Sequence, residues 1–189
     1  MIIRSRHLIL FSTLAMLAAC QTSKSTLEPR AIEIDGMGNA AAVDDLLIGG
    51  QPNEESLEKL AREGYRSVLT VRGEGEIDWD EQGRVEAFGM SFHRIDMSNP
   101  VNEITNDQVD AFARFMEQRA GPALVHCGSG NRAAGLWAAW LIEYQGVELE
   151  DAIRFAEAAG MRDSIGAVVE RRTNDRMMLC AELGNCPKR

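Results

Sequence analysis

A cysteine and an arginine stand close together in "ALVHCGSGNRAAGLW", a segment that begins apolar, turns glycine-rich and then reads as a helix. Gly128 and Gly130 permit backbone angles that other residues resist, so successive N–H groups can point inward around an anion. The positive end of the following helix adds to this attraction and favours the thiolate form of Cys127. The pattern predicts an anion-binding thiolate loop, although a cysteine is more often a small buried hydrophobe.

Arg132 falls on the first turn of the expected helix, above the same loop. Its planar guanidinium matches two oxygens of a tetrahedral oxyanion. Ser129 and Asn131 complete the loop, so we expect them to take part in anion binding together with the two glycines. His126 comes directly before the cysteine, and it either orders the loop or is a histidine satisfied at the end of a strand.

Apolar runs alternate with helical patterns along the chain. Strands separated by helices predict a single α/β domain with a central, mostly parallel sheet and helices on both faces. Ligands of such sheets bind beyond the carboxyl ends of the strands, which is where "HCGSGNR" falls. Strands are expected within 45–50, 65–71, 91–97 and 122–127, and helices within 52–64, 80–89, 105–118, 131–144, 148–160 and 165–179.

The motif "VHC..G..R" after a strand resembles the protein tyrosine and dual-specificity phosphatase superfamily. The stretch "IGGQPNEESLEKLAREGYRSVLTVRGEGE" is also similar to bacterial dual-specificity-like phosphatases, including the group related to the phosphatase-like domain of β-lactamase-hydrolase-like proteins. The likeness covers roughly residues 45–160, a span that fits one domain. It implies a dual-specificity-phosphatase-like fold.

The resemblance also implies roles for single residues. Cys127 matches the family's nucleophile, Arg132 its phosphate-binding arginine and His126 its loop-ordering histidine. The implied reaction is hydrolysis of a phosphate monoester, on a phosphoprotein or a small molecule. The thiolate would attack to give a cysteinyl-phosphate, which water then hydrolyses. No cofactor is implied.

The general acid is less clearly marked than the nucleophile. Asp96, in the loop after "SFHRI", lies close to where the family keeps the acid that protonates the leaving oxygen. Asp96 could instead be a solvated turn residue before "NP". Glu103 or Asp107 could replace it as the acid.

Two departures from the family leave other functions open. The superfamily's loop has five residues between cysteine and arginine, whereas residues 128–131 make four, and Ala133 stands where these phosphatases usually carry a Ser or Thr. A loop of four resembles that of the rhodanese sulfurtransferases, which implies a persulfide on Cys127 and thiosulfate chemistry. A non-catalytic oxyanion-binding lipoprotein is the third hypothesis, but a binding module would need no nucleophile.

The beginning of the chain resembles an exported lipoprotein. Arg4 and Arg6 precede an apolar run, Leu8–Leu17, that is too short to span a bilayer, and residues 1–19 therefore read as a signal peptide. "LAAC" resembles a lipobox, which implies lipidation of Cys20 and periplasmic exposure. Gln21 implies the outer membrane. The alternative is an ordinary signal peptide with an incidental cysteine. Residues 20–42 are expected to be the lipidated Cys and tether, and residues 43–189 the phosphatase-like domain.

Composition restricts the partners of the protein. The net charge is −9 and no basic run is present, which disfavours nucleic acid, so an anionic substrate needs a local site. The three histidines are dispersed, and no metal site is predicted. In "CAELGNC", Gly184 could turn Cys186 back toward Cys180, and we predict that disulfide with Cys127 free. The alternatives are three unpaired thiols or a redox switch at Cys127.

Overall fold

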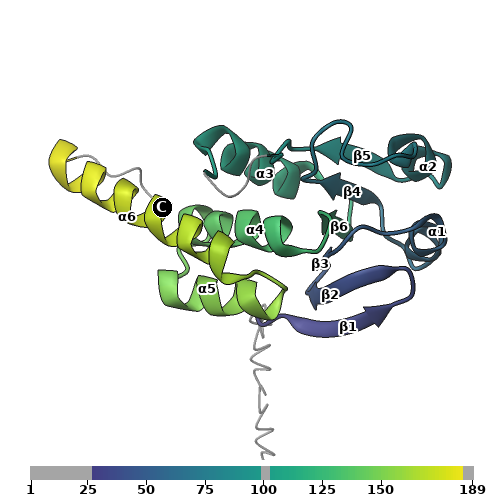
Figure 1. The fold of residues 1–189 in the computed structure, drawn as a ribbon, viewed down its shortest axis with the longest axis horizontal. Helices are drawn as coiled ribbons and strands as arrows, with labels where there is room; N and C mark the ends of the chain where they lie inside the picture. Colours follow the sequence, from purple (N-terminus) through teal and green to yellow (C-terminus); the bar gives the residue numbers. More distant parts are fainter. Residues whose placement is uncertain (1–26, 99–102, 185–189) are drawn as a thin grey trace, which may run out of the picture.

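The computed structural model describes residues 27–98 and 103–184, which form one sheet with helices packed against it (Figure 1). The strands are β1 Arg30–Ile34, β2 Met37–Val43, β3 Leu46–Gly49, β4 Ser67–Thr70, β5 Ser91–Arg94 and β6 Ala123–His126. The helices are α1 Glu54–Arg62, α2 Glu81–Ala87, α3 Asn106–Gln118, α4 Asn131–Tyr144, α5 Leu149–Ala158 and α6 Asp163–Leu183.

The sheet has the strand order β1-β2-β3-β6-β4-β5. Its four central and distal strands, β3, β6, β4 and β5, are parallel, whereas β1, β2 and β3 pair antiparallel. This confirms the expected α/β domain with a mostly parallel sheet. His126 at the end of β6 lies opposite Gly49 of β3 and Thr70 of β4, so three strands end together just before Cys127.

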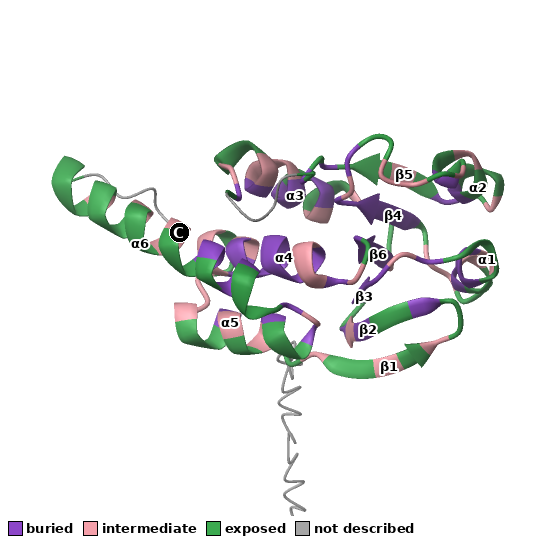
Figure 2. Cartoon of the chain, in the orientation of Figure 1, coloured by how far each residue is buried: buried purple, intermediate pink, exposed green. Residues whose placement is uncertain are grey.

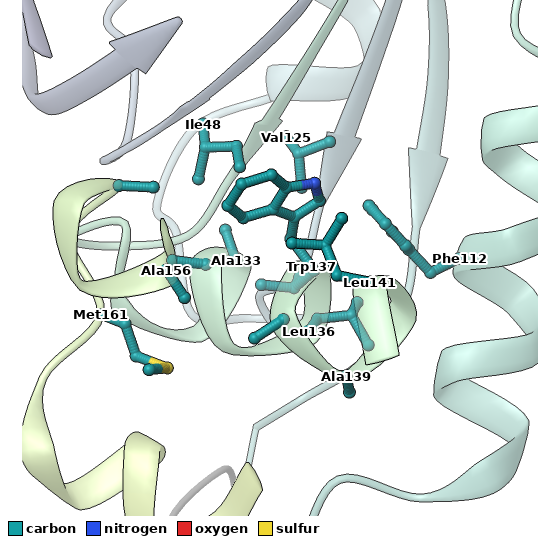
Figure 3. Close-up of a cluster of buried hydrophobic side chains, with 14 of the residues drawn as sticks. Ile48, Phe112, Val125, Ala133, Leu136, Trp137, Ala139, Leu141, Ala156 and Met161 are labelled. Atoms are coloured by element: carbon teal, nitrogen blue, oxygen red, sulfur yellow. The ribbon is translucent and has the colours of Figure 1, made fainter. Parts of the chain in front are cut away.

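Two apolar clusters cover the two faces of the sheet. Helices α1 and α2 pack on one face, where Leu57 and Val85 meet Leu124 of β6. Helices α3 to α6 contribute to the cluster on the other face, and α4 lies at its centre, buried along most of its length (Figure 2). Trp137 of α4 is 1% exposed and lies beside Val125 of β6 in this cluster (Figure 3). The helix that follows the loop is therefore held rigidly by the main core.

The N-terminal hairpin was not expected. Strand β1 and all but the last residue of β2 lie within residues 20–42, which were expected to be a tether, and this expectation is wrong. The available signal was Asp35–Gly36, a pair typical of tight hairpin turns, with φ +76° at Gly36. It was missed because β1 is largely exposed and lacks a clean alternation of apolar and polar residues.

Several sequence predictions concern residues outside the described ranges. These are the signal peptide, the lipidation of Cys20, and Cys186 as the partner of Cys180, which all stay predictions. Among the described residues, no helix is long and apolar enough to cross a membrane. Within the same ranges, no cluster of three or more potential metal ligands occurs.

Candidate active site

The predicted thiolate loop connects β6 directly to α4. Gly130 is the N-cap of α4 and has φ +87°, a left-handed angle that favours glycine. Cys127 is 1% exposed, and its backbone N–H donates to the carbonyl of Gly49 at 3.2 Å. The strand end and the helix start thus fix the cysteine at the N-terminal, positive end of α4.

Neighbouring segments hold the loop from outside through its carbonyls and one side chain. The Asn39 side chain donates to the Ser129 carbonyl at 2.9 Å, and the Gln51 N–H donates to the Gly128 carbonyl at 3.3 Å. Asn131 accepts from the Arg162 N–H at 2.8 Å. Within the described chain, the N–H groups of Gly128, Ser129, Asn131 and Arg132 meet no protein acceptor. These N–H groups can therefore serve a bound anion.

Arg132 is oriented by a carboxylate from the loop after β4. Its Nη1 and Nη2 donate to the two carboxylate oxygens of Glu76 at 2.8 and 2.6 Å, and Nη1 also donates to the Met97 carbonyl at 2.9 Å. Both Nη1 donors and one Nη2 donor are thereby used, so Nε–H and the second Nη2 donor remain as a fork for two oxygens of an anion. Glu76 thus leaves free the edge of the guanidinium, formed by Nε and Nη2, that can bind an oxyanion.

The charges of this pair are firmly set. Hydrogen bonding from Arg132 lowers the pKa of Glu76 to about 2, against the opposing effect of burial. The Glu76 hydrogen bond is also the main reason why the pKa of Arg132 is raised, and Cys127 contributes through its charge and a hydrogen bond. Arg132 therefore lies close to the sulfur and stays cationic.

A cavity of about 270 Å³ opens over the loop. Its walls come from the loop and from the beginning of α6 and comprise Cys127, Gly128, Ser129, Asn131, Arg132, Ser164 and Ile165. A nucleophilic sulfur, an arginine fork and free N–H groups therefore meet in a space that can hold a tetrahedral oxyanion. The sequence predicted all of these groups except the two from α6.

Comparison with known proteins decides the family. Residues 28–173 match the model of the family "DSP-PTPase phosphatase fused to NAD+ Kinase". The chain belongs to this family. It therefore contains a dual-specificity or tyrosine phosphatase-like domain, as the resemblance in the sequence implied.

Two curated relatives of the chain are consistent with this family. The Beta-lactamase hydrolase-like protein of Xylella fastidiosa is 35% identical over 98 residues, which make up 49% of this chain and 22% of the relative. The chain thus spans about a fifth of that protein's length. The Dual specificity protein phosphatase TpbA of Pseudomonas aeruginosa is 27% identical over 144 residues, 71% of this chain and 62% of the relative.

Solved structures share the fold of this phosphatase. The crystal structure of P. aeruginosa TpbA superposes with a TM-score of 0.62 at 20% identity, covering 78% of this chain and 92% of TpbA. A cysteine-to-serine variant of TpbA was solved in complex with phosphotyrosine, and it superposes with a TM-score of 0.61 at 20% identity, covering 78% and 91%.

Asp96 lies beside the site of this phosphatase rather than in its cavity. Its carboxylate accepts from the Ser98 N–H at 2.8 Å, and its carbonyl accepts from Gln108 at 2.7 Å. The next residue, Met97, supplies the carbonyl that binds Arg132. Asp96 is therefore joined to the site through one peptide unit. The other two candidate acids, Glu103 and Asp107, are exposed, and neither lines the cavity.

His126 belongs to the opposite face of the sheet from Cys127. It is fully buried, and its Nε2 lies 3.1 Å from a carboxylate oxygen of Glu81, the first residue of α2. Glu81 is itself only 1% exposed. His126 therefore supports the loop from behind and does not line the cavity.

Sequence reasoning missed the residues that support the site. Glu76, Glu81 and Asn39 come from three separate segments, and each reaches the loop or its arginine only through the fold. Arg72 also belongs to this group, since its Nε lies 3.6 Å from the Glu76 carboxylate. None of them stands at a characteristic spacing from Cys127, so no local pattern could mark them. Only the three-dimensional arrangement does.

Proposed function

We propose that this phosphatase hydrolyses phosphate monoesters through a covalent intermediate on Cys127. The thiolate attacks phosphorus, the P–O bond to the leaving group breaks, and a cysteinyl-phosphate forms. Water then attacks phosphorus, which releases inorganic phosphate and the thiolate. The observation that carries this proposal is the orientation of Arg132, because Glu76 and Met97 leave its Nε and Nη2 donors for two phosphate oxygens beside the sulfur.

Asp96 is proposed as the acid that protonates the leaving oxygen. Its support is positional, since it adjoins the residue that binds Arg132. Glu76 is nearer to the reacting groups, but a pKa of about 2 makes it a carboxylate at neutral pH, so it has no proton to give. Glu103 and Asp107 remain the alternatives to be tested.

The proposed substrates are phosphorylated proteins or small molecules, with an aryl phosphate such as phosphotyrosine first. The support is the complex of TpbA with phosphotyrosine, together with a cavity of about 270 Å³ that opens to solvent above the loop. Family membership favours ester hydrolysis over the persulfide chemistry that the short loop also suggests.

Turnover of an aryl phosphate tests the function and its residues. We expect Cys127→Ser to abolish kcat, Arg132→Lys to lower kcat/KM by about 10²–10³-fold, and Asp96→Asn to lower kcat by about 10²-fold. Asp107→Asn and Glu103→Gln are matched controls that should leave kcat unchanged. Cyanide-dependent conversion of thiosulfate, requiring Cys127 but indifferent to Asp96, would instead establish the sulfurtransferase. Oxyanion binding without either turnover would establish the binding module.

We also propose that the protein is anchored in the outer membrane, facing the periplasm, through a lipid on Cys20. The support is the "LAAC" sequence at the end of the expected signal peptide. Detergent-phase partitioning of the wild-type protein and of Cys20→Ala tests it. Only the wild type should enter the detergent phase, and equal partitioning would disprove the anchor.

A further inference from the structure

A buried carboxylate on the far side of the catalytic loop has no role in the proposed reaction. Glu81 and His126 are 1% and 0% exposed, and they lie 3.1 Å apart on the α1/α2 face of the sheet. The second Glu81 oxygen has no hydrogen-bond partner in the described residues. Burying a charge is costly unless it is paired, so a carboxylate in this place requires an explanation.

The contacts of Glu81 continue across the back of the site. Gln51 donates from Nε2 to the carboxylate of Glu81 at 2.5 Å, and its Oε1 accepts from Nη1 of Arg72 at 2.8 Å. The amide of Gln51 therefore has only one orientation that suits both neighbours. It presents its donor to an anion and its acceptor to a cation.

Arg72 extends these contacts to the other end of the loop. Its Nη2 donates to the Glu76 carbonyl, and its Nε lies 3.6 Å from the Glu76 carboxylate. Glu76 in turn binds Arg132 through both carboxylate oxygens. The charged side chains alternate in sign from Glu81 through Arg72 and Glu76 to Arg132, with the neutral Gln51 between the first two. Removing one of these charges would therefore change the hydrogen bonds and ion pairs of its neighbours on this path.

We propose that Glu81, Gln51, Arg72 and Glu76 form a polar relay that holds the two ends of the catalytic loop in one arrangement. The four are positioning residues: they act through His126 and Arg132 and do not touch the substrate. The relay rests on the proposed function for its role, but it couples the arginine to the residue before the nucleophile whatever anion binds. Glu81, which does not line the cavity, therefore influences how tightly Arg132 binds an oxyanion.

A charge swap tests the relay. Glu81→Gln removes the buried charge, and we expect kcat/KM for an aryl phosphate to fall about tenfold. Gln51→Glu places two carboxylates in contact and should cost more. The double variant Q51E/E81Q restores one donor opposite one carboxylate, and we expect it to recover kcat/KM to within about threefold of wild type. Glu86→Gln, on the exposed side of the same helix, is the matched control and should change nothing.

A second readout works without turnover. Phosphate should protect Cys127 from iodoacetamide, measured on its peptide by mass spectrometry, and Glu81→Gln should weaken that protection about as much as kcat/KM. Melting temperatures accompany each variant. Should Glu81→Gln fail to fold, Gln51→Ala decides, because Gln51 is only partly buried.

Two results would overturn the relay. One is a double variant no better than the worse single variant. The other is Glu81→Gln or Gln51→Ala with lowered melting temperature but unchanged kcat/KM and phosphate protection, which would make the contacts purely structural. A wild-type protein that binds phosphate without hydrolysing esters would instead refute the proposed function and leave the relay to be judged by protection alone.

Discussion

Glu76 is the residue whose ionisation is most strongly changed by the fold of the site. Arg132 lowers its pKa from the ordinary value of 4.5 to about 2. The pair therefore stabilises the protein fully above pH 4.5, and this contribution is lost as pH falls toward 2. The change in pKa corresponds to at most about 3–4 kcal/mol. Because the Glu76 side chain is 27% exposed, we expect solvent to reduce this to about 1–2 kcal/mol.

Glu76→Gln tests this at the residue scale. We expect the free energy of unfolding to fall by about 1–2 kcal/mol at pH 7, and the difference from wild type to shrink between pH 4.5 and pH 2. Denaturant unfolding over that range measures it. Glu74→Gln, an exposed carboxylate two positions away, is the control and should be neutral. A difference that does not depend on pH would contradict the assigned cause.

Gly73 keeps the two acidic residues beside the site in place. A Cβ on Gly73 would lie 2.9 Å from a carboxylate oxygen of Asp96, 2.8 Å from Cβ of Ser98 and 3.2 Å from an oxygen of Glu76. Gly73→Ala must therefore displace Asp96, the proposed acid, and Glu76, which binds Arg132. We expect kcat/KM to fall at least tenfold. Gly38→Ala, where the added Cβ meets nothing within 4 Å, should leave kcat/KM unchanged.

Whether a site residue could be predicted from the sequence depends on how far along the chain it lies from its partner. Cys127 and Arg132 could be predicted because one turn of backbone sets their relation. Glu76 could not, because it is 56 positions from Arg132 and is one of 29 acidic residues. Which carboxylate meets the arginine depends on how β4 and β6 pair, and no local pattern contains that information.

At the scale of elements, α4 and α6 approach each other closely where they border the cavity. A Cβ on Gly135 of α4 would lie 2.2 Å from Cγ2 of Ile165, a cavity residue at the start of α6. Gly135→Ala should therefore cost about 1–3 kcal/mol through overpacking and weaken substrate binding by moving Ile165. Melting temperature and KM measure the two effects.

Gly166, the neighbour of Ile165, is a position where we expect substitution by alanine to have the opposite effect on stability. A Cβ there meets only the flexible end of Met161 at 3.6 Å, an ordinary contact. Gly166→Ala should therefore stabilise α6 by about 0.5–1 kcal/mol, because alanine loses less backbone entropy than glycine in a helix. Equal effects of the two substitutions would show that the helices do not pack as described.

Elements with a local signal were predictable. Thr105 and Gln108 form a capping box where α3 was expected to begin, and α4 begins and ends at the expected residues, Asn131 and Tyr144. The β1–β2 hairpin was missed because its outer strand is largely exposed and lacks a clean alternation of apolar and polar residues. Its stability comes from pairing with β3, and the composition of the hairpin does not indicate that contact.

At the scale of the whole molecule, that hairpin joins the edge of the sheet to the catalytic loop. It covers β3, supplies Met37 and Ala40 to the core, and places Asn39 against the Ser129 carbonyl at 2.9 Å. Without it, β3 would be an uncovered edge strand with apolar residues on its faces. The hairpin is therefore part of the catalytic domain and not of a tether.

Shortening the chain tests this. We expect a protein that begins at residue 27 to keep the melting temperature and kcat/KM of the full chain, whereas one that begins at residue 44 should aggregate or lose most of its stability. Asn39→Gly separates the loop contact from the sheet. Glycine tolerates the φ of +49° at this position but removes the side chain, so kcat/KM should fall several-fold while the melting temperature changes little. If the chain beginning at residue 44 folds and turns over normally, the hairpin has no part in the site, because neither its pairing with β3 nor its contact with Ser129 is then needed.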